Sequence, residues 1–214
     1  MDFLILSIGV LLAPLPGAFL APMIHEWVKA CTSAVLGDPS PRKAGFLSWN
    51  PLKYFEPIGF LFMLAFGVGW GRPVPTSAFY YKDRRLGVIL VHIMPIITNL
   101  FVGMLVMFLW STFVDSLFGM VSGNDIPVLF MHVAHSSIHH FAAMNIGLAI
   151  FSLIPMYPLA GSKLLPLFVS PNTVMQLNQR EKPIQAIVII LLIFGVIPML
   201  LNPIIDFFMR LVWF

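Results

Sequence analysis

Long stretches without a charged residue dominate this chain. Four of them are long enough for the roughly 20 residues needed to cross the hydrocarbon core of a bilayer; they are residues 3–24, 86–114, 126–162 and 184–205. Of the 214 residues, 59% are hydrophobic and 10% are charged, whereas an average soluble domain has about 25% charged residues. Because so apolar a chain cannot cover itself with polar side chains, the sequence predicts an all-α integral membrane protein with about four transmembrane helices.

A fifth uncharged stretch, residues 57–71, has only 15 residues and is short for a span. Basic residues flank it on both sides. They are Arg42, Lys43 and Lys53 before the stretch, and Arg72, Lys82, Arg84 and Arg85 after it. A re-entrant hairpin, or a short helix pair buried against protein, would leave both flanks on one face. The positive-inside rule predicts that this face is cytoplasmic.

The basic residues also predict the orientation of the other loops. The segment from Asp115 to Asp125 has no Lys or Arg, so it should face away from the cytoplasm. Lys163, Arg180 and Lys182 should return the chain to the cytoplasmic side. The expected topology has the N-terminus outside, four spans and one re-entrant element.

The two ends of the chain give further expectations. Met1-Asp2 opens the sequence without a basic region, so we expect the first apolar stretch to be retained rather than cleaved as a signal peptide. The tail from Pro203 to Phe214 is too short to span, and Arg210 and Trp213 predict an interfacial helix there. No linker composition divides the chain, so residues 1–214 should form a single membrane domain.

Net charge and cysteine content argue against nucleic-acid binding and against a disulfide within the chain. The formal charge of +3 is small, and the basic residues act as topology signals, so nothing favours nucleic-acid binding. Cys31 is the single cysteine, which excludes an intramolecular disulfide. The partners to expect are the lipid bilayer and another transmembrane protein or a larger membrane complex.

A zinc-binding motif is present in altered form. His25-Glu26-Trp27-Val28-Lys29 has the frame of His-Glu-x-x-His, in which two histidines one helical turn apart bind zinc and the glutamate is the general base. Lys29 occupies the second histidine position. A protonated lysine repels a metal ion, and His25 alone cannot supply the roughly three protein ligands of such a site. We therefore expect no cofactor here.

Further segments, in this order and at these spacings, resemble the short bacterial site-2 proteases, which are intramembrane zinc metalloproteases. Pro155-Met156-Tyr157-Pro158-Leu159-Ala160-Gly161 is similar to their Pro-x-Pro-Pro-Leu-Asp-Gly element, whose aspartate is the third zinc ligand; Ala160 stands at that position. Other similar segments are Gly37–Pro41, Leu47–Leu52, Glu56–Gly59 and Gly69–Pro75. The resemblance implies a site-2 protease-like core that lacks two of its three zinc ligands.

Departures from the family pattern cluster at the implied active site. Ser152 stands where the family usually has an asparagine that contacts the substrate carbonyl. The family's Gly-Pro-x-x-Asn is matched only loosely by Met94-Pro95 and Asn99, with one extra residue between proline and asparagine. The resemblance also implies that Pro155–Gly161 lies beside the helical turn His25–Lys29. The family-equivalent positions are His25, Glu26, Lys29, Ser152 and Ala160.

Two alternatives describe Lys29. Without zinc, Glu26 would be an unpaired carboxylate in a medium of low dielectric constant, which is unfavourable. Lys29 could supply the counter-charge as the neighbour of Glu26 at i,i+3. Alternatively, Lys29 could extend to the nearby cytoplasmic interface and pair with nothing.

A stripe of histidines forms a second candidate site. His132, His135 and His139 share one face of a helix, with His140 to one side. Three imidazoles could bind a transition metal, but a single helix cannot surround the ion, so another element, such as the one carrying His92, would have to contribute. The alternative is a hydrated stripe near the outer interface that is hydrogen-bonded to water and to neighbouring serines.

Three functions remain compatible with the sequence. We expect a catalytically inactive relative of site-2 proteases, in the bacterial cytoplasmic membrane, that binds or scaffolds a membrane partner. The first alternative is an active zinc protease with rearranged ligands, in which Glu26 still polarises a water molecule. The second is a metal- or proton-handling membrane protein built on His132, His135 and His139.

Overall fold

The computed structural model of the chain describes residues 9, 11–120 and 125–212, and all regular structure in that part is helical. Residues 1–8, 10, 121–124 and 213–214 lie outside it. Part of the predicted span 3–24, the tip of the predicted outer loop and Trp213 therefore fall outside the described residues. The predicted all-α class is confirmed for the part of the chain that is described.

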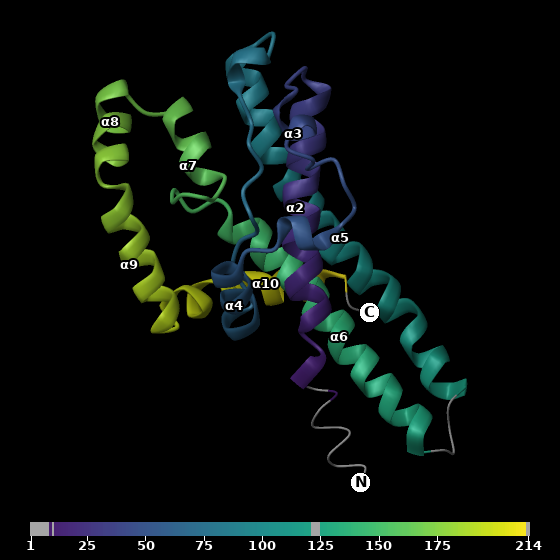
Figure 1. Ribbon diagram of the computed structural model, residues 1–214. Helices are drawn as coiled ribbons and strands as arrows, with labels where there is room; N and C mark the ends of the chain where they lie inside the picture. The colour runs from purple at the N-terminus through teal and green to yellow at the C-terminus, as the bar shows by residue number, and fades with distance from the viewer. Residues whose placement is uncertain (1–8, 10, 121–124, 213–214) are drawn as a thin grey trace.

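Three long helices form the main bundle: α2 (Leu15–Val35), α5 (Arg84–Met120) and α6 (Asp125–Phe151). Figure 1 shows α5 and α6 side by side and antiparallel, with α2 packed along both. Among the described helices, Arg84–Val114 of α5 is the one that is by itself long and apolar enough to cross a membrane. One apolar span is thus present, and the four-span arrangement stays a prediction.

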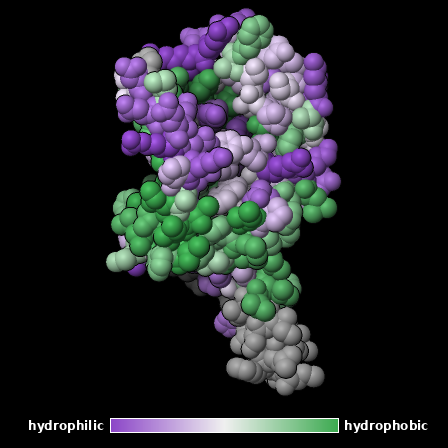
Figure 2. All heavy atoms as spheres, turned by 60° about the vertical axis from the view of Figure 1, so that its left-hand side comes forward, coloured by the Kyte–Doolittle hydropathy of each residue, from purple (hydrophilic) through white to green (hydrophobic). Residues whose placement is uncertain are grey.

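The short elements connect and cap these helices. They are α3 (Ser40–Lys43), η1 (Pro51–Tyr54), α4 (Pro57–Phe66), η2 (Ala78–Tyr80), α7 (Gly161–Leu164), η3 (Leu165–Leu167) and α8 (Pro171–Gln179). In Figure 1, α7 and α8, together with α9 (Glu181–Ile193), form an arch that stands to the left of the bundle. The face that this arch presents is hydrophilic in its upper part and hydrophobic over its middle (Figure 2).

The hairpin predicted for residues 57–71 is confirmed as a reversal of the chain. Its first limb is α4, which begins where the Glu56 carboxylate accepts the Gly59 N–H and ends at Gly67 with φ +72°. The second limb returns without regular structure and passes very close to the first. A Cβ at Gly59 would lie 2.0 Å from the carbonyl oxygen of Trp70. Glycine is required there because any side chain would separate the two limbs.

Two predicted spans are interrupted. Helix α6 ends at Phe151, because Pro155 and Pro158 cannot continue a helix, so 126–162 is not one helical span. The stretch 184–205 is also not a single helix: α9 and α10 (Val196–Leu211) meet at Gly195, with φ +73°, and are bent by 70°. The left-handed conformation that Gly195 permits, and not a proline, makes this break.

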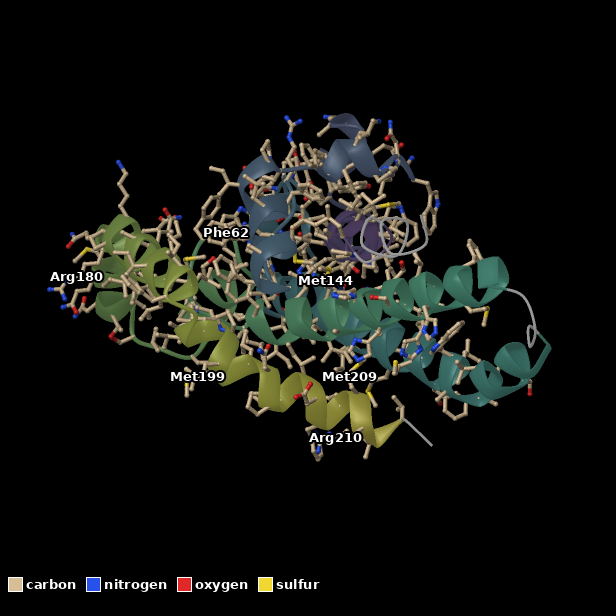
Figure 3. All side chains as sticks on the ribbon, turned by 90° about the horizontal axis from the view of Figure 1, so that it is seen from below. Phe62, Met144, Arg180, Met199, Met209 and Arg210 are labelled. Atoms are coloured by element: carbon tan, nitrogen blue, oxygen red, sulfur yellow. The ribbon has the colours of Figure 1, made fainter. Side chains whose placement is uncertain are left out.

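The C-terminal helix differs from the predicted interfacial helix of residues 203–214. It begins at Val196 and contains Pro203 within it. Its buried side chains recur every four residues and pack against the bundle; they are Ile197, Leu201, Ile205 and Met209. Helix α10 is thus a packed element that contacts α6 and lies along one side of the bundle in Figure 3. The main hydrophobic core lies where α5, α6 and α10 meet.

Candidate functional site

The turn His25–Lys29 lies in the buried face of α2. His25, Glu26 and Lys29 are each less than 8% exposed, because α2 packs against both α5 and α6. Long charged side chains are almost never buried to this extent unless they have a partner. The Glu26 carboxylate and the Lys29 ammonium therefore need partners within the protein.

Lys29 is the partner of Glu26. Its Nζ lies 3.3 Å from Glu26 Oε2 and 3.4 Å from Oε1. The same carboxylate accepts the backbone N–H of Val74 at 2.9 Å. The predicted ion pair is confirmed, and the alternative of a lysine extended to the interface is wrong. Glu26 consequently fixes the return limb of the hairpin to α2.

Asparagines and histidines surround this pair. Asn99 is fully buried and donates through Nδ2 to the Ala21 carbonyl at 3.1 Å and to Asn145 Oδ1 at 3.2 Å. His25 Nδ1 and Asn99 Oδ1 are both buried without a hydrogen bond of normal geometry, although the two side chains are neighbours. Asn145 was not identified from the sequence; a lone asparagine in an apolar helix was the available signal.

His92 belongs to this site and not to the histidine stripe. Its ring Nδ1 lies 2.9 Å from the Val88 carbonyl, and its ring is within electrostatic range of His25, Lys29 and Lys163. Helix α7 packs against α5, and Lys163 of α7 lies within electrostatic range of His92. The placement of Pro155–Gly161 beside the His25–Lys29 turn stays a prediction.

The other two positions singled out by the resemblance, Ser152 and Ala160, offer no free ligand group. Ser152 is buried and donates to the Leu148 carbonyl of its own helix at 2.6 Å. Ala160 is buried and has only a methyl group. Within residues 9, 11–120 and 125–212, no group of three or more His, Cys, Asp or Glu side chains is placed to hold a metal. The donor set at His25 therefore does not fit zinc, which needs about three protein ligands.

The histidine stripe lies further along the bundle. Trp110 Nε1 donates to His135 Nδ1 at 2.8 Å, and the rings of His135 and His139 are 6.5 Å apart. His140 Nδ1 lies 2.7 Å from the Ser136 carbonyl, and His132 is exposed. Trp110 follows His92 by 18 residues on α5, or about 27 Å of helix. The structure does not bring His92 to the stripe; instead it brings Asp206 of α10 near His139.

A cluster of hydrogen bonds centres on Asp38, three residues after the end of α2. The buried Asp38 carboxylate accepts the Ser33 hydroxyl at 2.8 Å, the Ser40 N–H at 2.9 Å and the Ser77 N–H at 2.7 Å. Burial raises the pKa of Asp38, but these hydrogen bonds outweigh burial, so the pKa lies below its usual value of 3.8. Because Ser77 follows the return limb, Asp38 and Glu26 hold the same loop at two points.

Comparison with known proteins gives one informative similarity. No family model matches the chain, and no solved structure matches it. The chain is 28% identical over 161 residues to a Bacillus subtilis protein named "Putative zinc metalloprotease YwhC"; the alignment covers 74% of this chain and 69% of that protein. This similarity fits a metalloprotease-like family.

Proposed function

We propose that this chain is a catalytically inactive relative of zinc metalloproteases that binds a segment of a membrane partner. The buried Glu26–Lys29 pair is the observation that carries the proposal. In a zinc-dependent site the glutamate must be able to act on a water molecule. Here its oxygens are engaged by Lys29 and by the Val74 N–H, which gives Glu26 a structural role instead.

A cleft beside this pair is the proposed binding site. A cavity of ≈ 280 Å³ lies between the hairpin, the segment around Pro158 and α9. Its wall is aromatic and apolar with a few polar groups; it comprises Glu56, Trp70, Pro73, Met156, Tyr157, Pro158, Gln185 and Ile189. Pro73 precedes Val74, so the loop that Glu26 anchors forms one side of the cleft. Such a wall suits an extended apolar segment fixed by a small number of hydrogen bonds.

The membrane setting is part of the same proposal. We place the chain in a bacterial cytoplasmic membrane with four spans and the N-terminus outside. The apolar helix α5 and the absence of Lys and Arg between Arg85 and Lys163 support this orientation.

Site-specific photo-crosslinking tests the binding function. A photoreactive amino acid at Tyr157, in the cleft, should capture a discrete membrane protein that remains uncleaved. The same amino acid at Phe194, which is 79% exposed at the end of α9, should not capture it and serves as the matched control. Equal capture from both positions would contradict a specific cleft.

The similarity to a protein named as a zinc metalloprotease supports a second candidate, an active protease with rearranged ligands. Metal analysis of the purified protein separates the two. The binding function predicts less than about one-tenth equivalent of zinc, because His25 lacks the other ligands. A stoichiometric zinc that disappears on His25→Ala, together with partner cleavage lost on Glu26→Gln, would establish the protease instead.

A further inference from the structure

A second cavity lies on the bundle far from the cleft, between α5, α6 and α10. Its volume is ≈ 430 Å³, within the range of roughly 300–1,000 Å³ typical of small-ligand sites. Six residues line it: Met107, His135, His139, Asp206, Met209 and Arg210. Five of the six carry a thioether, an imidazole or a carboxylate, which are the side-chain groups that bind metal ions.

The register of α5 against α6 brings Met107 to His139. Trp110 is hydrogen-bonded to His135, and a Cβ at Gly103 would lie 2.7 Å from the Ala142 carbonyl oxygen. In this antiparallel pair, a residue of α5 lies opposite the residue of α6 whose number brings the sum of the two numbers to about 245, as for Trp110 with His135 and Gly103 with Ala142. Met107 accordingly faces the turn that contains His139.

The end of α10 brings Met209 to the same place. Ser111 Oγ donates to the Val212 carbonyl at 3.1 Å, which fixes the end of α10 to α5. Met107 lies one turn before Ser111, and Met209 lies one turn before Val212. Both methionines are buried in one core cluster. Figure 3 shows Met209 on the side of α10 that faces the bundle and Arg210 on the other side.

The lining holds one carboxylate, Asp206, and one guanidinium, Arg210. Asp206 lies within electrostatic range of His139, and both side chains are exposed to the opening. The Arg210 guanidinium forms no ion pair with Asp206 within the described residues. His135 is engaged through Nδ1 by Trp110, so His139 is the imidazole that we assign as a ligand.

We propose that this cavity binds a soft monovalent cation, Cu(I) or its analogue Ag(I), through Met107, Met209 and His139. Thioether sulfur selects Cu(I) over harder ions, whereas zinc prefers thiolate, imidazole and carboxylate ligands in sets of about four. Asp206 is the carboxylate in the lining that lies near His139. The site involves three helices, none of its ligands belongs to the cleft, and it does not depend on the proposed binding function.

Binding of Ag(I), a redox-inert probe, to the full-length protein in detergent tests the proposal. The wild-type protein should retain about one equivalent after removal of excess metal, and Cu(I) from a competing chelator should displace it. Met107→Leu, Met209→Leu and His139→Gln should each weaken Ag(I) binding by at least about tenfold, since even outer-shell changes at metal sites reach this scale. Methionine-to-leucine changes conserve volume and should leave the fold intact.

Matched controls distinguish this site from non-specific binding. Met199→Leu changes an exposed methionine on α10 away from the cavity (Figure 3), and it should leave Ag(I) binding unchanged. His132→Gln changes an exposed histidine of the stripe that does not line the cavity, and it should also have no effect. The proposal is overturned if the Met107→Leu/Met209→Leu double variant binds Ag(I) as the wild type does, if Met199→Leu reduces binding equally, or if Zn²⁺ binds more tightly than Cu(I).

Discussion

Lys29 Nζ and Glu26 Oε2 lie 3.3 Å apart in the buried face of α2, and the same carboxylate holds the Val74 N–H. A buried ion pair often adds little stability relative to apolar residues, whereas removal of one partner leaves a charge that nothing compensates. The pair should therefore be visible as an energetic coupling between the two positions.

Single changes at this pair should be costly. Lys29→Met leaves the Glu26 carboxylate buried without its counter-charge, and Glu26→Gln does the same to the Lys29 ammonium. Each should lower the free energy of unfolding by about 3–5 kcal/mol. The double variant should lose clearly less than the sum, because neither charge is then present.

A double-mutant cycle on thermal stability in detergent measures this coupling. Lys43→Met, at an exposed lysine outside the site, combined with Glu26→Gln provides the matched control and should be additive. A coupling energy between Glu26 and Lys29 within about 0.3 kcal/mol of zero is incompatible with a functional ion pair.

Restoring the missing ligands should restore some metal binding. Lys29→His places a second imidazole one turn after His25, and Ala160→Asp adds a carboxylate on the segment that is predicted to lie beside this turn. The double variant should retain zinc, and each single variant should retain much less because it still lacks a ligand. Elemental analysis after dialysis gives the answer; equal zinc in the double variant and the wild type would show that Pro155–Gly161 does not reach the turn.

Reporter fusions test the membrane topology. Fusions after Lys43, Arg85 and Arg180 should report the cytoplasm, since the Lys and Arg residues gather there. A fusion at Gly123, which lies outside the described residues, should report the opposite side. Fusions after Lys43 and Arg85 on opposite sides would mean that residues 57–71 cross the membrane, against the hairpin seen between α4 and its return limb.

Part of the architecture followed from the placement of charged residues. Uncharged stretches located α5 and the apolar parts of α2 and α6, and the 15-residue gap between basic clusters predicted the hairpin. The bend at Gly195 was missed, because glycine within an apolar run gives no signal of its conformation. The sequence also suggested a separate helix after Pro203. In the structure Pro203 lies inside α10, whose buried side chains before and after it, Leu201 and Ile205, both pack against the bundle.

At the candidate site, the interaction between side chains was predictable from the sequence, and the interaction with the backbone was not. The spacing of Glu26 and Lys29 predicted their pairing, since residues three apart are neighbours on a helix. The Val74 N–H was not predictable, because every residue but proline has one and its position depends on the loop. Asp206 and Met209 lie near the histidine stripe because α10 packs there. No local sequence pattern specifies where α10 packs, so this proximity was not predictable.

Acid should destabilise the loop that Asp38 holds. The folded-state pKa of Asp38 is lowered from 3.8 by hydrogen bonds from Ser40, Ser77 and Ser33, which outweigh the effect of burial. A lowered folded-state pKa means that the ionised carboxylate stabilises the fold above the unfolded pKa, which is the ordinary value of 3.8. That contribution is lost as the pH falls through the lower, folded-state value.

Asp38→Asn should reduce stability at neutral pH and flatten the dependence of Tm on pH in the acid range. Glu181→Gln, at a partly exposed carboxylate on α9, should preserve the wild-type dependence. Thermal unfolding in detergent from about pH 7 to pH 2.5 measures both, and an acid dependence in Asp38→Asn as steep as that of the wild type would assign the effect to other carboxylates.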